Sequence, residues 1–215
     1  MIPKKRKPGI SLTDIGRKWS PFVVGERFYI TPPSFNEEKH DMINIILGPG
    51  RAFGSGEHET TRHCLELMET LSFSPYYGVL DYGTGTGILA IASVKLNAGS
   101  VLALDNNFNA VLTCKNNIHL NTIDENVTVV CGDLTCINPH YQFHIILANL
   151  YSDIILDHSS FLTKNLKKYG YLLLSGIDWD YLDDVKKRFS QLNYQIVNQR
   201  TGNDYNSIIY RKIVD

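Results

Sequence analysis

A glycine-rich turn and the acidic residue that follows it are the part of this sequence best suited to specific chemistry. Glycines occupy positions 83, 85 and 87, at the end of the run that starts with Asp81, and Asp105 follows the next apolar run. Glycine lets the backbone turn sharply out of a strand and leaves room where a Cβ would meet a ligand. An acid about 20 residues beyond such a turn can accept hydrogen bonds from both hydroxyls of a ribose. The pattern predicts a nucleoside-binding site, and the alternative is an ordinary strand–turn–helix in which Asp105 caps the next helix.

The glycine spacing argues against a dinucleotide fingerprint. That fingerprint, G-x-G-x-x-G, requires a glycine at position 88, where this chain has Ile88. With no pyrophosphate to bind, the turn can face a zwitterionic amino-acid group instead. We therefore predict S-adenosylmethionine as the cofactor, and the cofactor-binding residues expected in this turn are Asp81, Gly83, Gly85 and Gly87.

A second unusual segment precedes the turn. Five glycine or proline residues lie between Gly48 and Gly56, ahead of a helix predicted to start near Glu59. A loop of this composition can lie over a ligand. Thr60 and Thr61 would offer hydroxyl groups at the helix start, where free N–H groups and the helix dipole favour a carboxylate. Taken alone, the segment is equally consistent with a plain loop before a capped helix.

The elements that would position these residues form an α/β fold. From Tyr77 onward, apolar runs alternate with helical periodicity, which predicts a doubly wound, seven-stranded, mainly parallel sheet. The last two strands are too close in the sequence for a helix to connect them. They should therefore form an antiparallel hairpin, which gives the sheet one antiparallel strand. Phe108, Val111, Leu112 and Ile118 mark one predicted apolar helix face. The predicted strands are 78–81, 100–104, 127–131, 143–148, 169–175, 193–199 and 206–213.

The region before Tyr77 predicts a short β extension. Three apolar runs, 22–24, 27–30 and 43–47, are expected to be short antiparallel strands. The resulting division is a flexible basic tail at 1–16, a β extension with a cofactor-covering loop at 17–58, and a methyltransferase domain at 59–215. The tail contains Lys4-Lys5-Arg6-Lys7, and nucleic-acid contact through it is not expected.

Composition describes an ordinary globular protein. The 215 residues carry a formal net charge of -1, without the excess of base typical of duplex-binding proteins. Cys64, Cys114, Cys131 and Cys136 form no C-x-x-C pair, so we expect reduced thiols and no metal. No long apolar run suggests membrane insertion or export, and the cytoplasm is the expected location.

The glycine turn with Asp105 and the glycine- and proline-rich segment before it together resemble the PrmA family, methyltransferases that act on ribosomal protein L11. The family motif Ala-Phe-Gly-Thr-Gly-x-His-x-Thr-Thr is matched by Ala52 to Thr61, with Ser55 in place of threonine. The resemblance continues through the glycine turn and Asp105, through Ala148-Asn149-Leu150-Tyr151, and through Leu173 to Ile177. It covers roughly residues 17–213, which is nearly the whole chain.

The resemblance implies S-adenosylmethionine as methyl donor and amino nitrogens, mostly of lysine, as acceptors. By position, Phe53, Thr60 and Leu150 would contact the cofactor, and Asp105 would hold its ribose. Asp133 would receive the adenine amino group, unless it is simply an acid in a surface loop. Asn149 would sit beside the methyl group as the catalytic residue, unless it only caps the next helix. Tyr151 would line the acceptor channel.

The acceptor is less closely defined than the donor. Full-length members of the family carry a separate recognition domain, whereas this chain has fewer than twenty residues before the matching region. We expect a protein substrate, with a ribosomal protein among the candidates. The alternatives are a small-molecule amine, a nucleic-acid base, or a catalytically silent cofactor-binding module. His58 and Glu57 are candidate proton acceptors to which no role is assigned.

Overall fold

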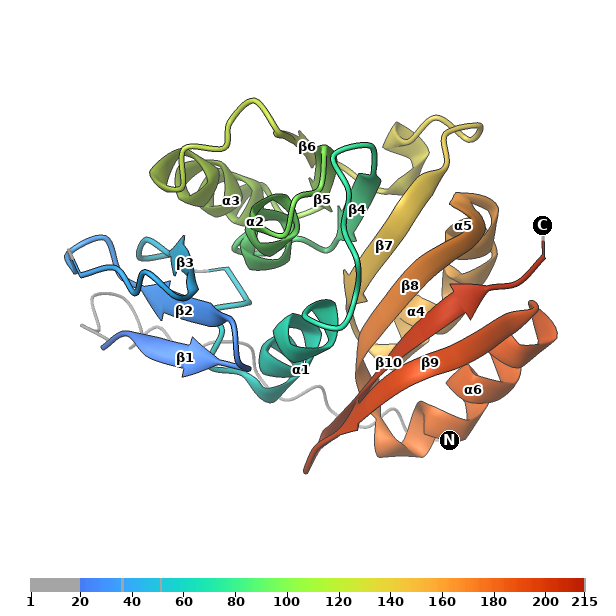
Figure 1. The fold of residues 1–215 in the computed structure, drawn as a ribbon. Coiled ribbons are helices and arrows are strands. Elements are labelled where there is room, and N and C mark those ends of the chain that lie inside the picture. The colour runs from blue at the N-terminus through green and yellow to red at the C-terminus, as the bar shows by residue number, and fades with distance from the viewer. Residues whose placement is uncertain (1–19, 36, 51, 215) are drawn as a thin grey trace.

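The computed structural model describes residues 20–214 except 36 and 51. Its central feature is a seven-stranded sheet with the order β6-β5-β4-β7-β8-β10-β9 (Figure 1). Only β10 runs antiparallel to its neighbours, β8 and β9. This confirms the predicted doubly wound sheet with one reversed strand. The strands are β4 (Gly78–Tyr82), β5 (Ser100–Asp105), β6 (Val127–Cys131), β7 (Phe143–Asn149), β8 (Leu166–Asp178), β9 (Tyr194–Thr201) and β10 (Tyr205–Lys212).

Helices cover both faces of the sheet because each crossover between parallel strands must return over one face. Figure 1 shows α1, α2 and α3 on one side and α4, α5 and α6 on the other. The α-helices are α1 (Glu59–Met68), α2 (Ile88–Lys95), α3 (Phe108–Leu120), α4 (Ser152–Asp157), α5 (Ser159–Lys164) and α6 (Leu182–Gln191). The described residues also include the 3-10 turns Leu134–Cys136 and Trp179–Tyr181.

Two hydrophobic cores hold these layers together. One core packs Leu65 of α1 and Ile91 of α2 against Val79 and Ile145 of the sheet. The other packs Ile155 of α4, Leu162 of α5 and Phe189 of α6 against the opposite face. Because the sheet is buried on both sides, its carboxyl edge is held rigidly, and this is the edge where ligands bind in such folds.

The β extension forms a separate small sheet of β1 (Phe22–Val24), β2 (Phe28–Thr31) and β3 (Ile43–Ile46). The prediction that all three strands are antiparallel is wrong, because β2 and β3 pair in parallel. The connection between them, residues 32–42, is long enough to bring the chain back to its starting end. Val24, Phe28 and Ile45 are fully buried in the same core as α1 and α2.

Side-chain hydrogen bonds attach this small sheet to the helices. The carboxylate of Glu69, which follows α1, accepts from the backbone N–H groups of Glu26 and Arg27. Asn121, the C-cap residue of α3, makes a reciprocal pair of hydrogen bonds with the backbone of Ile46, at 3.0 and 2.7 Å. The start of the glycine- and proline-rich segment is therefore held at a fixed place relative to α3.

The predicted apolar face of α3 needs a correction. Val111 and Ile118 are buried as expected, but Phe108 is 63% exposed and Leu112 is 45% exposed. The face that packs on the sheet is completed by Ala110, Cys114 and Asn117, which lie at helical spacing from Val111 and Ile118. Phe108 and Leu112 therefore face solvent.

The expected basic tail at 1–16 lies outside the described residues. Within the described ranges, no helix has both the length and the apolar character needed to cross a bilayer.

Candidate functional site

A cavity of about 580 Å³ opens at the carboxyl edge of the sheet. Its walls come from the ends of β4, β5 and β7 and from the loop before α1, elements that are distant in the sequence. A volume of this size is within the range of small-ligand and cofactor sites. The predicted site residues that line it are Phe53, Thr60, Gly83, Gly85, Asp105, Asp133, Asn149, Leu150 and Tyr151.

The glycine turn has the backbone that its sequence suggests. Gly83, Gly85 and Gly87 have φ values of 74°, 55° and 83°, in the left-handed region that side chains rarely adopt. At Gly83 and Gly85, the position that a Cβ would take is already crowded by other atoms of the protein. A Cβ on Gly83 would lie 2.4 Å from Leu150 Cδ2, and one on Gly85 would lie 2.3 Å from the carbonyl oxygen of Phe53. The glycines thus let two other walls of the cavity approach the turn.

The Gly85→Ala variant should therefore move the loop that carries Phe53. We expect the free energy of unfolding to fall by about 1–2 kcal/mol because of the positive φ, and the affinity for S-adenosylmethionine to fall severalfold. Gly25→Ala is a matched control, since Gly25 also has a positive φ of 61° but does not line the cavity. Thermal unfolding and calorimetric titration of both variants measure the two effects. Equal cofactor affinity in the two variants would show that the contact between loop and turn is unimportant for binding.

Hydrogen bonds hold the 52–58 loop on the glycine turn. The backbone N–H of Thr86 donates to the Phe53 carbonyl at 3.0 Å, and Thr86 Oγ1 donates to the Gly54 carbonyl at 2.6 Å. From the other side, the buried Asn117 donates to the Thr86 carbonyl and accepts from the Gly48 N–H. Phe53 and Gly54 are thus fixed to the turn directly, and Asn117 joins the turn to the preceding segment at Gly48.

His58 ends this loop and caps α1. Its Nδ1 accepts from the Thr60 backbone N–H at 3.3 Å and lies 2.9 Å from Thr60 Oγ1. The ring is 4.9 Å from that of Phe53 and 5.6 Å from that of Tyr205. Burial lowers the pKa of His58, so the ring is neutral near pH 7 and its remaining N–H is on Nε2. With Nδ1 already occupied, His58 is better suited to shaping the loop than to accepting a proton. Glu57 is exposed and does not line the cavity.

Asp105 lies at the end of β5, directly across from the turn. The Gly85 N–H donates to Asp105 Oδ2 at 3.0 Å, and the Asn107 N–H donates to Oδ1 at 2.9 Å. These two bonds fix the carboxylate plane. A carboxylate has about four lone-pair sites, so each oxygen can still accept a hydrogen bond from a ligand.

Asp81 and Gly87 lie behind the cavity wall rather than in it. Asp81 is 1% exposed, and its Oδ2 accepts from Thr84 Oγ1 at 2.6 Å and from the Ala90 N–H at 3.1 Å. It thereby ties the turn to the first part of α2. Gly87 faces α3, where a Cβ would lie 2.7 Å from Cys114 Sγ. In this arrangement both residues support the turn from beneath, which differs from the predicted direct contact with cofactor.

Burial raises the pKa of Asp81 from 3.8 to about 7, and this gives a stability prediction. Between pH 3.8 and about pH 7, Asp81 keeps its proton in the folded protein and loses it in the unfolded chain. The free energy of unfolding should therefore fall as pH rises through this range. Asp81→Asn cannot ionise and preserves the acceptor oxygen. We expect its stability advantage over the parent to grow by about 2–3 kcal/mol between pH 5 and pH 8. Denaturant unfolding at both pH values measures this, with Asp124→Asn as an exposed control. A constant difference would mean that Asp81 is ionised throughout.

Asn149 is the last residue of β7 and lines the cavity. Its Nδ2 lies 3.5 Å from Oγ1 of the buried Thr61. A donor contact at this nitrogen leaves the amide oxygen as the group available to a ligand. Asn149 does not cap α4, whose N-cap residue is Tyr151. The alternative of a purely helix-capping asparagine is therefore not what the structure shows.

Leu150, Tyr151 and Asp133 complete the predicted set. Leu150 is held by a hydrogen bond from its N–H to the Ser175 carbonyl at 3.0 Å, and its side chain covers Gly83. Tyr151 is 52% exposed at the cavity. Asp133 accepts from the Thr135 N–H at 2.8 Å, and hydrogen bonds from Thr135 lower the pKa of this exposed carboxyl group.

Sequence reasoning missed several lining residues. Tyr205 reaches the cavity because β10 inserts between β8 and β9. In the sequence, only the short connection before β10 indicated this strand order. Gly176, at φ 81°, lies where a Cβ would be 2.3 Å from the Leu150 carbonyl oxygen. Among the described residues, no group of three His, Cys, Asp or Glu side chains is placed to hold a metal ion.

Comparison with known proteins identifies the family. The sequence profile described as Ribosomal protein L11 methyltransferase (PrmA) matches residues 12–213. The chain belongs to the PrmA family. This confirms the resemblance seen in the two motifs and, with it, the enzyme class and the dependence on S-adenosylmethionine.

Individual relatives agree with the profile. Ribosomal protein L11 methyltransferase from Campylobacter concisus is 37% identical over 202 residues, which cover 94% of this chain and 70% of that protein. Its counterpart from Caldicellulosiruptor saccharolyticus is 38% identical over 194 residues, covering 90% of this chain and 63% of that protein. The crystal structure of ribosomal protein L11 methylase from Lactobacillus delbrueckii subsp. bulgaricus matches with a TM-score of 0.80 and 29% identity, covering 90% of this chain and 100% of that one. This PrmA-family chain thus spans between 63% and 70% of the length of these two curated relatives.

Proposed function

We propose that this chain transfers a methyl group from S-adenosylmethionine to an amino nitrogen of a protein, either a lysine side chain or an N-terminal amine, and that ribosomal protein L11 is the acceptor. The observation that carries the proposal is the cavity that joins the Asp105 carboxylate to the Asn149 amide, in a chain of the PrmA family. Relatives named for methylation of ribosomal protein L11 support the choice of acceptor. Such a reaction would take place in the cytoplasm, where we expect this chain to act.

The residues of the cavity fit the proposed cofactor. One end offers a fixed carboxylate, Asp105, for the ribose hydroxyls, and the exposed carboxyl group of Asp133 lies on the wall beyond it. Ala110, Leu150 and Ile154 supply apolar surface for a flat base. Since the pKa of Asp133 is lowered, its carboxylate remains an acceptor for an exocyclic amino group at pH 7.

The glycine turn and the loop before α1 would enclose the other end. We assign Gly83 and Gly85 to the methionine portion and Phe53 and Thr60 to the cover above it. Thr60 is 2% exposed and lies in the first turn of α1, where the helix dipole favours a carboxylate. The division into a covering segment at 17–58 and a methyltransferase domain at 59–215 is part of this proposal.

The acceptor must arrive with a free lone pair. When bound, S-adenosylmethionine supplies an electrophilic methyl group that an amine can take in one displacement. A lysine has a reference pKa of about 10.4, so its neutral form at pH 7 costs about 4.6 kcal/mol. A partly apolar mouth lowers this pKa by disfavouring the ammonium form. Tyr151 and Tyr205, both lining the cavity, would exclude water from the amine.

Asn149 would orient the amine. Its amide oxygen can accept one amine N–H and turn the lone pair toward the methyl group. Positioning alone contributes about 7–11 kcal/mol in well-oriented reactions, so no covalent intermediate with the protein is required. The buried Thr61 hydroxyl beside Asn149 Nδ2 would keep the amide from rotating.

A labelling experiment tests the proposal. Purified protein is incubated with tritiated S-adenosylmethionine and recombinant ribosomal protein L11, and the labelled peptide is mapped by mass spectrometry. We expect stoichiometric label on lysine or the N-terminal amine, and a labelling rate about a hundredfold lower with Asn149→Ala. Label confined to RNA or small molecules in a lysate, or no label with cofactor bound, would contradict the proposal.

A further inference from the structure

The part of the amino edge formed by β4, β7, β8 and β10, opposite the cavity, is basic and aromatic. The described segments there, 74–78, 138–144, 164–171 and 209–214, contain no Asp or Glu; Asp215 follows the last of them in the sequence, and Asp124 and Glu125 precede β6 farther along the edge. The same segments place four lysine or arginine residues at the surface, Lys164, Lys167, Lys168 and Arg211, although the whole chain has a net charge of -1; Lys212 is buried and donates to the Thr163 and Leu166 carbonyls. We define the amino-edge patch by Tyr76, His144, Lys167, Lys168, Tyr169 and Arg211.

The patch is continuous in space. Lys167 Nζ lies 3.0 Å from His144 Nε2, and the Tyr77 ring stacks on His144 with centroids 4.5 Å apart. At the other end, the Lys168 ammonium and the Arg211 guanidinium each lie 5.4 Å from the centroid of the Tyr169 ring. Cations and ring faces are therefore interleaved across β7, β8 and β10.

Tyrosine rings stand out from this edge. Tyr76 is 87% exposed and Tyr169 is 55% exposed, far more than an aromatic ring in a core. Tyr169 also has a φ of 62°, which a non-glycine residue adopts only at a cost. It belongs to an irregular part of β8, where pairing with β7 jumps from Leu166 to Tyr171. The bulged segment holds the ring at the surface, beside the Lys168 and Arg211 cations.

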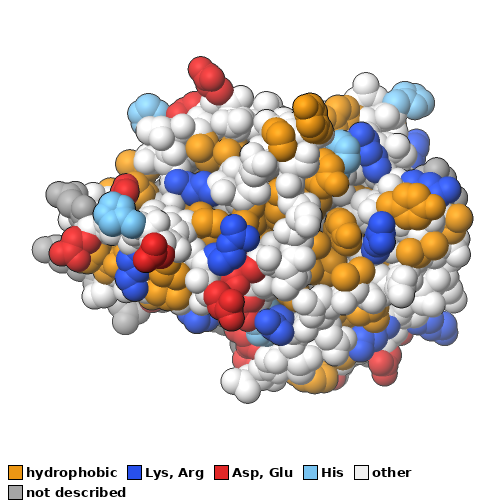
Figure 2. Space-filling model, viewed as in Figure 1, with side chains coloured by type: hydrophobic (Ala, Val, Ile, Leu, Met, Phe, Trp, Pro, Cys, Tyr) orange, Lys and Arg blue, Asp and Glu red, His pale blue; other side chains and the backbone are white. Residues whose placement is uncertain are grey.

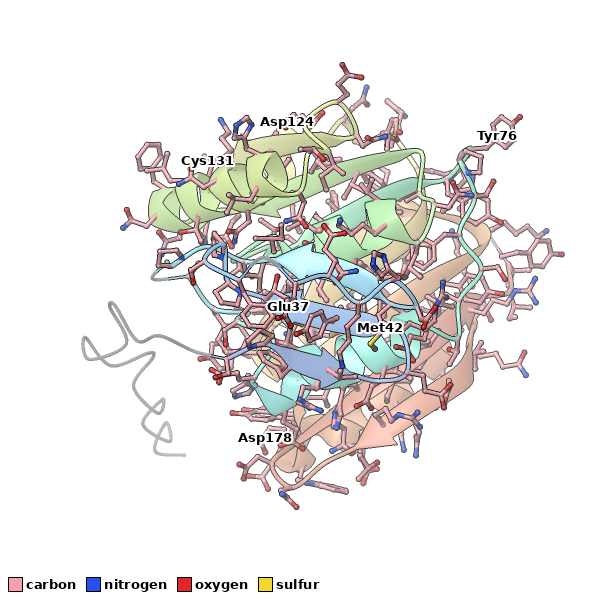
Figure 3. All side chains as sticks on the ribbon, turned by 60° about the vertical axis from the view of Figure 1, so that its left-hand side comes forward. Glu37, Met42, Tyr76, Asp124, Cys131 and Asp178 are labelled. Carbon is pink, nitrogen blue, oxygen red and sulfur yellow. The ribbon has the colours of Figure 1, made fainter. Side chains whose placement is uncertain are left out.

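The figures show how this charge is distributed. Over the beginning of β8 and the end of β10, Figure 2 shows blue, pale blue and orange side chains among the described residues. Figure 3 shows Tyr76 projecting from the molecule at the opposite end from Asp178, the last residue of β8. A ligand on the amino-edge patch would therefore leave the proposed methyl-transfer site open.

We propose that the amino-edge patch binds single-stranded nucleic acid. Lysine and arginine contact phosphates, and exposed tyrosine faces stack on bases, the combination used by proteins that bind single strands. Duplexes are not favoured, because their base faces are covered by stacking. The tyrosine rings are flat and end in a hydroxyl group, so they suit bases better than they suit lipid chains. The composition of the whole chain did not predict this grouping of cations and tyrosines.

Fluorescence anisotropy with labelled single strands of ~12 nucleotides tests this proposal. Oligo(U) and oligo(dT) distinguish RNA from DNA, and a duplex of the same length, an acidic peptide and anionic vesicles serve as competitors. We expect the single strands to bind, with affinity falling with salt at a logarithmic slope of about -2, as for three phosphate contacts. Preferential binding of the duplex, the peptide or the vesicles would overturn the proposal, as would no binding at low salt.

Two variants separate charge from stacking. Tyr169→Gly removes the ring and also relieves the positive φ, so the fold should be retained while affinity falls about fivefold or more. Lys168→Ala with Arg211→Ala should reduce both the affinity and the salt slope. Lys186→Ala with Lys187→Ala, on α6, removes the same charge elsewhere and should change neither. Unchanged binding of S-adenosylmethionine by every variant confirms folding. Equal nucleic-acid affinity in all of them would exclude the patch.

Discussion

Replacing Asp105 with alanine is expected to weaken the binding of S-adenosylmethionine by about tenfold to a hundredfold, through two lost charge-assisted hydrogen bonds. The carboxylate is fixed by the backbone N–H groups of Gly85 and Asn107, so its free lone pairs point at one place in the cavity. Isothermal titration calorimetry measures the effect. Affinity equal to that of the parent protein would remove Asp105 from the cofactor site.

Two further variants separate binding from support of the turn. Asp105→Asn preserves one acceptor oxygen and should give an intermediate loss of affinity. Asp124→Ala removes an acid that is exposed on the surface beside His119 and should leave cofactor binding unchanged. If Asp105→Ala lowers the unfolding temperature but not the affinity, its carboxylate serves only to hold Gly85 and Asn107.

Replacing Asn149 with alanine is expected to reduce turnover by about a hundredfold while cofactor affinity stays nearly constant. The amide oxygen would be lost from the place where the acceptor amine arrives, and the hydrogen bonds that shape the cofactor end do not involve this side chain. Single-turnover methyl transfer on the identified acceptor, alongside calorimetry of cofactor binding, measures both quantities.

Thr61 supplies the comparison for this prediction. Thr61→Val retains the volume of a fully buried side chain and removes the oxygen 3.5 Å from Asn149 Nδ2. If the amide works by orientation, this variant should lose turnover partially, with little change in cofactor affinity. Full turnover in Asn149→Ala would show that another group orients the amine.

Much of the fold follows from local patterns in the sequence. The apolar runs that became β4, β5 and β7 are continuous because the sheet is covered on both faces. The hairpin between β9 and β10 followed from a connection too short for a helix. Because the carboxyl ends of parallel strands meet at one edge, the sequence also predicted that the glycine turn, Asp105 and Asn149 would come together, and all three line the cavity.

What the sequence did not predict depends on long-range contacts. The parallel pairing of β2 with β3 accompanies contacts that are distant in the sequence, among them the hydrogen bond between Asn121, at the end of α3, and the Ile46 backbone. Asp81 looked like a ligand group, but its position in β4 directs it beneath the turn, toward Thr84 and Ala90. Tyr205 reaches the cavity only through the order of strands. No single-segment pattern carries this kind of information.

A crystal structure of the protein with bound S-adenosylhomocysteine tests the central claim most directly. We predict the ligand in the cavity between the 52–60 loop and the ends of β4, β5 and β7, with both ribose hydroxyls within hydrogen-bonding distance of the Asp105 carboxylate. Ligand bound elsewhere, or a ribose turned away from Asp105 at full occupancy, would contradict the account.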